Sequence, residues 1–223
     1  MSAPRQLALA LPHAESFARE DFLTGASNRA ALGLIERWPD WPDRALALLG
    51  PEGAGKSHLA AIWADIAGAR RVSARALGES DLPAALATGA LVIEDASPPL
   101  DERALFHLLN LMRQQEAYVL ITARTAPASW SVVLPDLASR LRAVPAIELE
   151  APDDTLLRAV LVKLFADRQL MVDESLIAYL ATRIERSFAG ARRAVEELDR
   201  EALQQKRPVT RSLAAETLSC RNA

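Results

Sequence analysis

The chain has 223 residues, of which 50% are apolar and 25% charged, and its formal net charge is −3. This composition is that of a globular protein, and the slightly acidic balance excludes a general electrostatic attraction to nucleic acid or anionic membranes. The single cysteine, Cys220, excludes a disulfide framework, and no apolar run reaches the length of a transmembrane helix, so we expect a cytoplasmic protein with no membrane partner.

We expect residues 1–20 to form a mobile N-terminal arm. In this arm Leu7, Leu9 and Leu11 alternate with alanines and follow Gln6, so an extended backbone would place the leucines on one side. Alternation alone does not separate an exposed docking peptide from a strand or tail that packs on its own domain. The run is short for a signal peptide and lacks a small-residue cleavage site, so we expect no export.

The segment 21–28 is rich in turn-forming residues and leads into a helix whose apolar positions recur at helical spacing up to Trp38. Pro39 follows directly, and a proline disfavours helical geometry in the residue before it. We therefore expect this helix to end at Trp38.

An apolar run at 45–49, of the length of a buried strand, leads into the most informative motif of the chain. The motif matches the phosphate-loop pattern G-x-x-x-x-G-K-[ST], and it comprises Gly50, Pro51, Glu52, Gly53, Ala54, Gly55, Lys56 and Ser57, with His58 in the helix that follows. The glycines let successive N–H groups point at phosphate, Lys56 adds a positive charge, and the Ser57 hydroxyl is the usual Mg²⁺ ligand. The helix N-terminus also favours anions. The motif therefore predicts a nucleotide-binding site.

A continuous apolar run at 90–93 predicts a second buried strand, which ends in Glu94 and Asp95. Acidic residues in this position lie beside the phosphate loop in doubly wound sheets. We expect Glu94 to hold Mg²⁺ and Asp95 to polarise an attacking water. An acidic helix N-cap would place the same residue types here, but the phosphate loop favours the functional interpretation.

The remaining pattern separates an α/β part from an all-helical part. Strands are expected at 118–122 and 146–149, with a weak candidate at 71–73, and helices at 82–87, 105–112 and 134–141. Beyond Pro152 only helical periods occur, at 154–168, 174–184, 188–205 and 210–218. We expect a parallel sheet flanked by helices in residues 21–151 and a small helical subdomain in residues 152–223.

This order of motifs resembles the AAA+ ATPases, and within them the DnaA clade, over about residues 21–218. The segment 21–28 is similar to the clade's motif beside the nucleotide base. The segment 135–141 is similar to the arginine-finger segment of the Hda-type proteins, short DnaA homologues that inactivate the replication initiator. The segment 5–11, a glutamine followed by alternating leucines, resembles the sliding-clamp motif of the same proteins.

The resemblance implies an AAA+ core with a helical lid, bound ADP or ATP with Mg²⁺, and weak or absent intrinsic ATPase activity. It assigns Arg140 as an arginine finger supplied in trans, Arg124 as a candidate γ-phosphate sensor, and the arm residues Gln6, Leu7, Leu9 and Leu11 to a DNA polymerase sliding clamp. The initiator DnaA is the second expected partner. Assembly into a homo-oligomer stays open, and we expect no direct binding of duplex DNA.

Two positions depart from the family pattern. The strand-end pair is Glu94-Asp95 where the initiator has two aspartates, and Ala189 stands where the lid carries a sensor arginine. Arg192 and Arg193 lie about one turn later and are candidates to replace it.

The alternative function is that of a helicase loader, an AAA+ ATPase that acts on single-stranded DNA. Loaders need a basic surface with aromatic side chains, whereas this chain has 5% aromatic residues and no basic run. A small-molecule kinase is disfavoured by the helical C-terminal third.

Overall fold

The computed structural model describes residues 17–220, which fall into two compact units. One unit spans Phe17–Ala151, and the other takes in the chain from Pro152 onwards. The predicted docking residues Gln6, Leu7, Leu9 and Leu11 lie outside the described residues. Among residues 17–220 no helix combines the length and apolar character needed to cross a membrane.

The first unit is built on a five-stranded sheet with the order β2-β3-β4-β1-β5. All neighbouring strands pair in parallel, and their bounds are Ala45–Leu49 for β1, Arg70–Ser73 for β2, Ala90–Ala96 for β3, Tyr118–Ala123 for β4 and Ala146–Glu148 for β5. The central strands are continuous apolar runs because both faces of the sheet are covered by helices. The predicted α/β architecture is confirmed, and β4 lies between β1 and β3.

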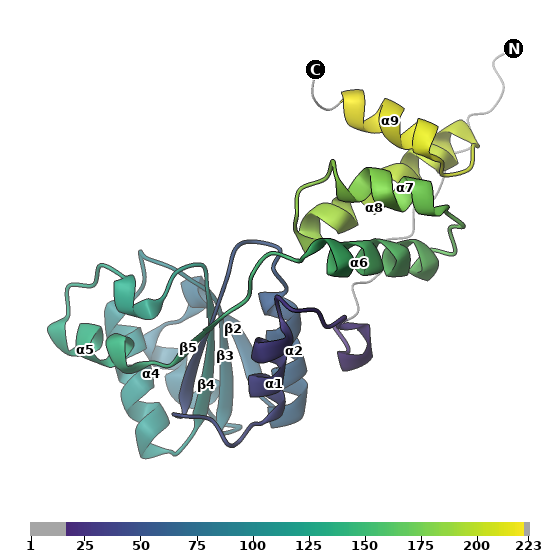
Figure 1. The fold of residues 1–223 in the computed structure, drawn as a ribbon. Helices are drawn as coiled ribbons and strands as arrows, with labels where there is room; N and C mark the ends of the chain where they lie inside the picture. Colours follow the sequence, from purple (N-terminus) through teal and green to yellow (C-terminus); the bar gives the residue numbers. More distant parts are fainter. Residues whose placement is uncertain (1–16, 221–223) are drawn as a thin grey trace, which may run out of the picture. The chain divides into compact units, whose positions relative to one another are not determined.

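Helices cover both faces of this sheet (Figure 1). Their bounds are Arg29–Glu36 for α1, Lys56–Ala67 for α2, Leu82–Ala85 for α3, Glu102–Gln114 for α4 and Pro135–Ala143 for α5. One apolar cluster packs α1 and α2 on one face, through side chains such as Ile35 and Leu59. A second cluster packs α3, α4 and α5 on the other, through Leu108 and Leu137 among others. The two apolar clusters therefore lie on opposite faces of the sheet, with α2 on one face and α5 on the other.

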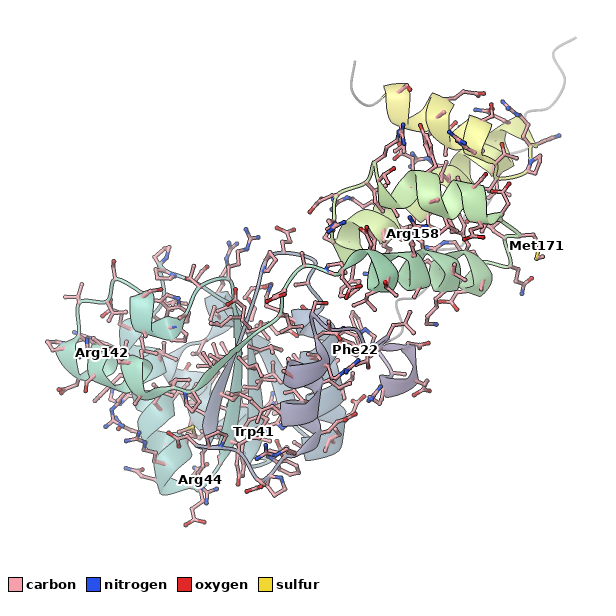
Figure 2. All side chains as sticks on the ribbon, viewed as in Figure 1. Phe22, Trp41, Arg44, Arg142, Arg158 and Met171 are labelled. Carbon is pink, nitrogen blue, oxygen red and sulfur yellow. The ribbon has the colours of Figure 1, made fainter. Side chains whose placement is uncertain are left out.

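An aromatic cluster fixes α2 against the segment that follows α1. The rings of Trp41 and Trp63 stack with their centroids 4.9 Å apart, and Trp38 and Tyr118 approach them edge to face. Trp41 (Figure 2) also donates its indole N–H to the Leu34 carbonyl at 2.9 Å. Burial of such large rings stabilises the position of α2, whose first residue is Lys56.

The second unit is a helical bundle. Its helices are Asp154–Asp167 (α6), Glu174–Ala181 (α7), Phe188–Gln205 (α8) and Arg211–Cys220 (α9). Asp153, Asp173 and Ser187 each accept a backbone N–H from the residue three positions on, which satisfies a donor in the first turn. Phe165 and Leu176 are among the side chains that form its core. We expected α7 to extend to residue 184, but it ends at Ala181, six residues before the cap of α8.

The start of the first unit differs from the expected boundary. Residues 17–20, which we expected in the arm, are grouped with the α/β unit. His58 on α2 explains this grouping, because its ring lies 5.5 Å from that of Phe17 and its Nε2 lies 2.9 Å from the Ala18 carbonyl oxygen.

Candidate nucleotide-binding site

The phosphate loop connects the last residue of β1 to the first turn of α2. Gly50 has a φ of 147°, and a Cβ on this residue would lie 2.5 Å from the Leu149 carbonyl oxygen. Gly55, the N-cap of α2, has a φ of 94° in the left-handed region. Both positions therefore require glycine, and the first N–H groups of a helix have no partner within the helix and favour an anion.

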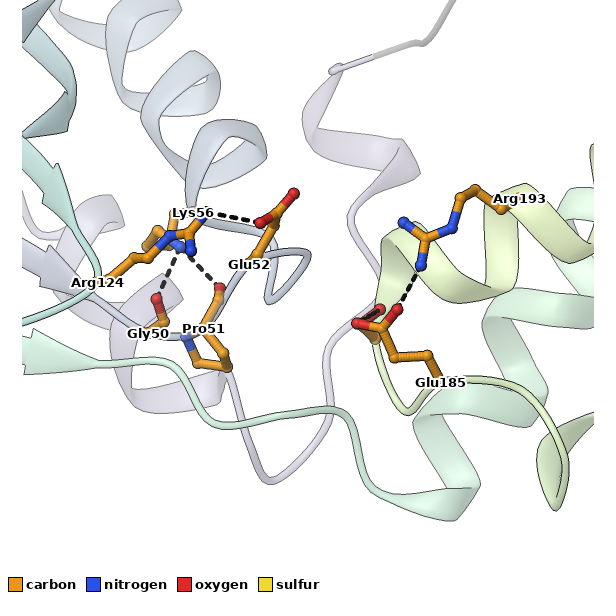
Figure 3. Close-up of polar contacts among 8 residues, drawn as sticks. Gly50, Pro51, Glu52, Lys56, Arg124, Glu185 and Arg193 are labelled. Atoms are coloured by element: carbon orange, nitrogen blue, oxygen red, sulfur yellow. Dashed lines mark hydrogen bonds and ion pairs between the residues drawn. The ribbon is translucent and has the colours of Figure 1, made fainter.

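Lys56 is the buried cation of this loop. Its side chain folds back so that Nζ donates to the carbonyl oxygens of Gly50 at 2.8 Å and Pro51 at 2.7 Å (Figure 3). Only 7% of the residue is exposed. This burial lowers the pKa of Lys56 from its ordinary value. The Asp95 carboxylate opposes the shift, whereas the positive charge of Arg124 adds to it. The ammonium group is thus held at the loop by neutral acceptors that an anionic phosphate can replace.

This lowered pKa makes nucleotide affinity sensitive to alkaline pH. Phosphates favour the protonated lysine, so the pKa of Lys56 is higher in a complex than in the free protein. Between these two pKa values binding takes up a proton, and we expect affinity to fall as pH rises, by up to about tenfold per pH unit. Calorimetric titration in buffers of different ionisation enthalpy measures this proton uptake. Equal apparent enthalpies in all buffers would contradict the assignment, and Lys56→Met should abolish the pH dependence.

Arg124, the candidate phosphate sensor, lies at the carboxyl end of β4 and bonds back to the phosphate loop. Its Nη2 donates to Glu52 Oε2 at 2.6 Å (Figure 3). Both side chains are mostly exposed, 69% and 72%, so the pair contributes little to stability. Arg124 can therefore exchange this partner for a phosphate at small cost.

The carboxyl end of β3 contains a β-bulge. Ile93 pairs with Ile121 but Ala96 pairs with Ala123, so Glu94 and Asp95 together oppose Thr122. Asp95 has a φ of 54°, and its backbone N–H donates to the Thr122 hydroxyl at 3.0 Å. A bulge re-aims the side chain it carries, so Asp95 departs from the regular alternation of the strand. Thr122, fully buried, fixes this bulge, a role that its place in an apolar run did not reveal.

Glu94, the expected Mg²⁺ ligand, is paired with an arginine. Arg71 on β2 donates to Glu94 Oε1 through Nη2 at 2.5 Å and through Nε at 2.9 Å. Sequence reasoning missed Arg71, because its partner lies on another strand and nothing in the local pattern indicates the pair. Arg71 therefore engages Oε1 of Glu94, and the assignment of Glu94 as an Mg²⁺ ligand stays a prediction.

Ser57 and Asp95 fit a metal site better. Ser57 lies exposed on the first turn of α2, and its hydroxyl makes no hydrogen bond within residues 17–220. Asp95 is exposed and forms no ion pair in that same range, and its charge acts on Lys56. No group of three or more metal-binding side chains occurs among the described residues. Mg²⁺ in phosphate sites retains several waters and takes few protein ligands, so Ser57 and Asp95 stay candidates for such a site.

His58 joins the segment 21–28 to the phosphate loop. Its ring contacts Phe22 edge to face, with centroids 5.1 Å apart. Buried Asn28 orders the segment, since it accepts from the Gly25 N–H at 2.8 Å and donates to the Leu23 carbonyl at 3.0 Å. The segment expected beside the nucleotide base is therefore held against the first turn of α2.

Arg140 lies far from this loop within the same unit. Its guanidinium stands 5.1 Å from the centre of the Phe106 ring, and the residue borders a small hollow together with Ala45, the first residue of β1. The phosphate loop follows the opposite end of β1, and a five-residue strand spans about 13 Å or more. Arg140 forms no ion pair with any described residue, so it is a cation directed away from its own phosphate loop.

The lid arginines lie on α8. Arg193 pairs with Glu185 (Figure 3), and Ser187 also donates to this carboxylate at 3.1 Å. Ala189 stands where the family pattern has a sensor arginine, and it is half-buried. Arg192 lies in the second turn of the helix. A role of Arg192 or Arg193 in nucleotide sensing stays a prediction.

Comparisons with known proteins identify the fold. No protein-family model and no curated protein sequence matches the chain. Domain III of the Thermotoga maritima replication initiation protein DnaA is similar with a TM-score of 0.75 at 19% identity, over 94% of this chain and 98% of that chain. AMPPCP-bound DnaA from Aquifex aeolicus gives a TM-score of 0.62 at 18% identity, over 81% and 64%.

The branch migration motor RuvB from Thermotoga maritima, which acts on Holliday junctions, gives a TM-score of 0.70 at 18% identity, over 88% of this chain and 69% of that chain. At these identities the likeness establishes the fold. The chain has the AAA+ fold that DnaA and RuvB share.

Proposed function

We propose that this protein is a DnaA-related AAA+ adaptor of the Hda type. It binds ADP or ATP at the phosphate loop, docks on a sliding clamp through its N-terminal arm, and stimulates ATP hydrolysis by the initiator DnaA. Its effect is negative regulation of replication initiation. The observation that carries the proposal is that Arg140 lies near the start of β1, whereas the phosphate loop of the same unit follows the end of β1.

The phosphate loop supports the nucleotide part of the proposal. Buried Lys56 and the N-terminus of α2 provide positive potential for the phosphates. Mg²⁺ bound at Ser57 would neutralise phosphate charge and orient the β- and γ-phosphates. Aquifex aeolicus DnaA, which shares the fold, has been solved with AMPPCP.

Arg140 supports the adaptor part. A cation–π contact contributes about 0.5–2 kcal/mol, and a charge-assisted hydrogen bond to phosphate is stronger, so half-buried Arg140 can leave the Phe106 ring for an anionic partner. The nucleotide of a neighbouring molecule is such a partner, and an arginine finger in trans stabilises transition-state charge there. Hydrolysis then takes place on the partner's nucleotide, and this chain needs little turnover of its own.

The arm provides the direct test of clamp docking. Gln6→Ala combined with Leu7→Ala is expected to weaken clamp binding about 10- to 100-fold, because burial of one leucine alone contributes about 1.5–3 kcal/mol. Affinity for the clamp is measured by surface plasmon resonance, and nucleotide affinity should stay unchanged. Ala8→Ser with Ala10→Ser is the matched control, since these positions alternate with the leucines. Normal clamp binding by the Gln6/Leu7 variant would show that the arm has a structural role instead.

A pull-down tests the adaptor as a whole. The full chain, loaded with ADP, should retain the clamp and ATP-bound initiator and raise the initiator's hydrolysis rate. Rapid ATP turnover by the isolated protein together with single-stranded DNA binding would favour a loader-type ATPase.

A further inference from the structure

The Arg71–Glu94 pair lies on the face of the sheet that α2 covers. Val92, two residues before Glu94 on β3, packs in the cluster with α2, whereas Ile93 packs on the opposite side. Because side chains alternate along a strand, Glu94 projects to the α2 face. Its carboxylate is therefore on the side of the phosphate loop, but it is drawn sideways to the edge strand β2.

Arg71 is itself fixed by a second contact. Its guanidinium carbon lies 5.9 Å from the centre of the Phe17 ring, and Phe17 packs on His58, next to Ser57. Both guanidinium nitrogens that reach Glu94 bond to the same oxygen, Oε1. The arginine is thus oriented on two sides, and the charge of Glu94 is neutralised.

Asp95 differs from Glu94 in its backbone conformation and in its charged partners. Asp95 has a left-handed backbone conformation within the bulge, it pairs with no described cation, and its charge acts on Lys56. The family pattern places two acidic residues at this strand end, and of the two only Glu94 is paired with a described cation.

We propose that Arg71 is a positioning residue that withdraws Glu94 from the metal–nucleotide site and leaves Asp95 as the carboxylate that serves it. The inference rests on the proposed nucleotide site. It predicts that Mg²⁺ strengthens ATP binding through Ser57 and Asp95, independently of Glu94. Removal of Arg71 would free a second carboxylate, which repels metal-free phosphates and attracts the metal.

The measured quantity is the ratio of ATP affinity with excess MgCl₂ to ATP affinity with excess EDTA, from calorimetric titration of the full chain. Glu94→Gln should leave this ratio unchanged, whereas Asp95→Asn should lower it by about tenfold, the effect of one charge-assisted contact. Arg71→Gln should raise it by roughly two- to fivefold, the range for a partly exposed ion pair.

A double-mutant cycle separates positioning from a general loss of charge. Glu94→Gln in the Arg71→Gln background should return the ratio to the wild-type value, because the freed carboxylate is then absent. Arg75→Gln, which removes an exposed arginine from the turn after β2, is the matched control and should leave the ratio unchanged.

Two kinds of failure are distinguishable. If the wild-type chain binds ATP in neither buffer, the phosphate site is wrong and this inference fails with it. If it binds ATP but Glu94→Gln alone lowers the ratio as Asp95→Asn does, Glu94 serves the metal and only this inference is overturned. The Glu94→Gln variant decides the matter even if Arg71→Gln fails to fold.

Discussion

Lys56→Ala should reduce ADP and ATP affinity by about 10- to 150-fold, the range for loss of a hydrogen bond to a charged group. Lys56 is the buried cation of the loop and its Nζ already lies within 2.8 Å of the loop carbonyls. A ligand at one hundred times its Kd stabilises the folded state by about 2.7 kcal/mol, which raises Tm by roughly 5–10 °C for a chain of this size. The variant should lose most of this thermal shift.

The matched control is Lys206→Ala. Lys206 is an exposed lysine at the end of α8, so its removal changes the net charge equally without touching the loop. Differential scanning calorimetry with and without ADP compares the two variants. An ADP-dependent shift that persists in Lys56→Ala would contradict the assignment of the phosphate site.

The fold was largely predictable because its signals are local. Buried parallel strands are continuous apolar runs, and the phosphate loop is a contiguous motif whose flanking strand and helix follow from periodicity. The strand at 71–73 was weak in sequence because most of its residues are exposed, and it proved to be the edge strand β2. We expected the first helix to end at Trp38, but α1 ends two residues earlier, at Glu36.

The site was predictable only in part, because some of its geometry depends on pairing between strands. The bulge at Glu94 and Asp95 is set by the register with Thr122 and cannot be read from two adjacent acidic residues. The partner of Glu94 comes from β2, 23 positions earlier. Local sequence therefore placed both carboxylates at the end of β3 but did not distinguish their environments.

Arg140→Ala should abolish stimulation of the initiator while folding and nucleotide affinity stay intact. An arginine finger contributes about 10³–10⁵ to the rate of hydrolysis, so the stimulated component should fall by at least about 10³-fold. Folding is expected to survive because Arg140 forms no ion pair with any described residue and its contact with Phe106 is weak. The measurement is single-turnover hydrolysis of ATP bound to the initiator, with clamp and adaptor in excess.

Arg142→Ala provides the matched control on the same helix. Arg142 lies two residues further along α5 and is exposed (Figure 2), so its removal changes the same surface by the same charge. If both variants lose stimulation equally, α5 contributes only a general positive field to docking.

Arg140→Lys refines the test, since lysine keeps the charge but lacks the planar fork that binds phosphate in bidentate fashion. Loss of stimulation in Arg140→Lys with normal adaptor–initiator binding would assign Arg140 to the transition state, whereas normal stimulation by Arg140→Ala would show that Arg140 is a surface charge.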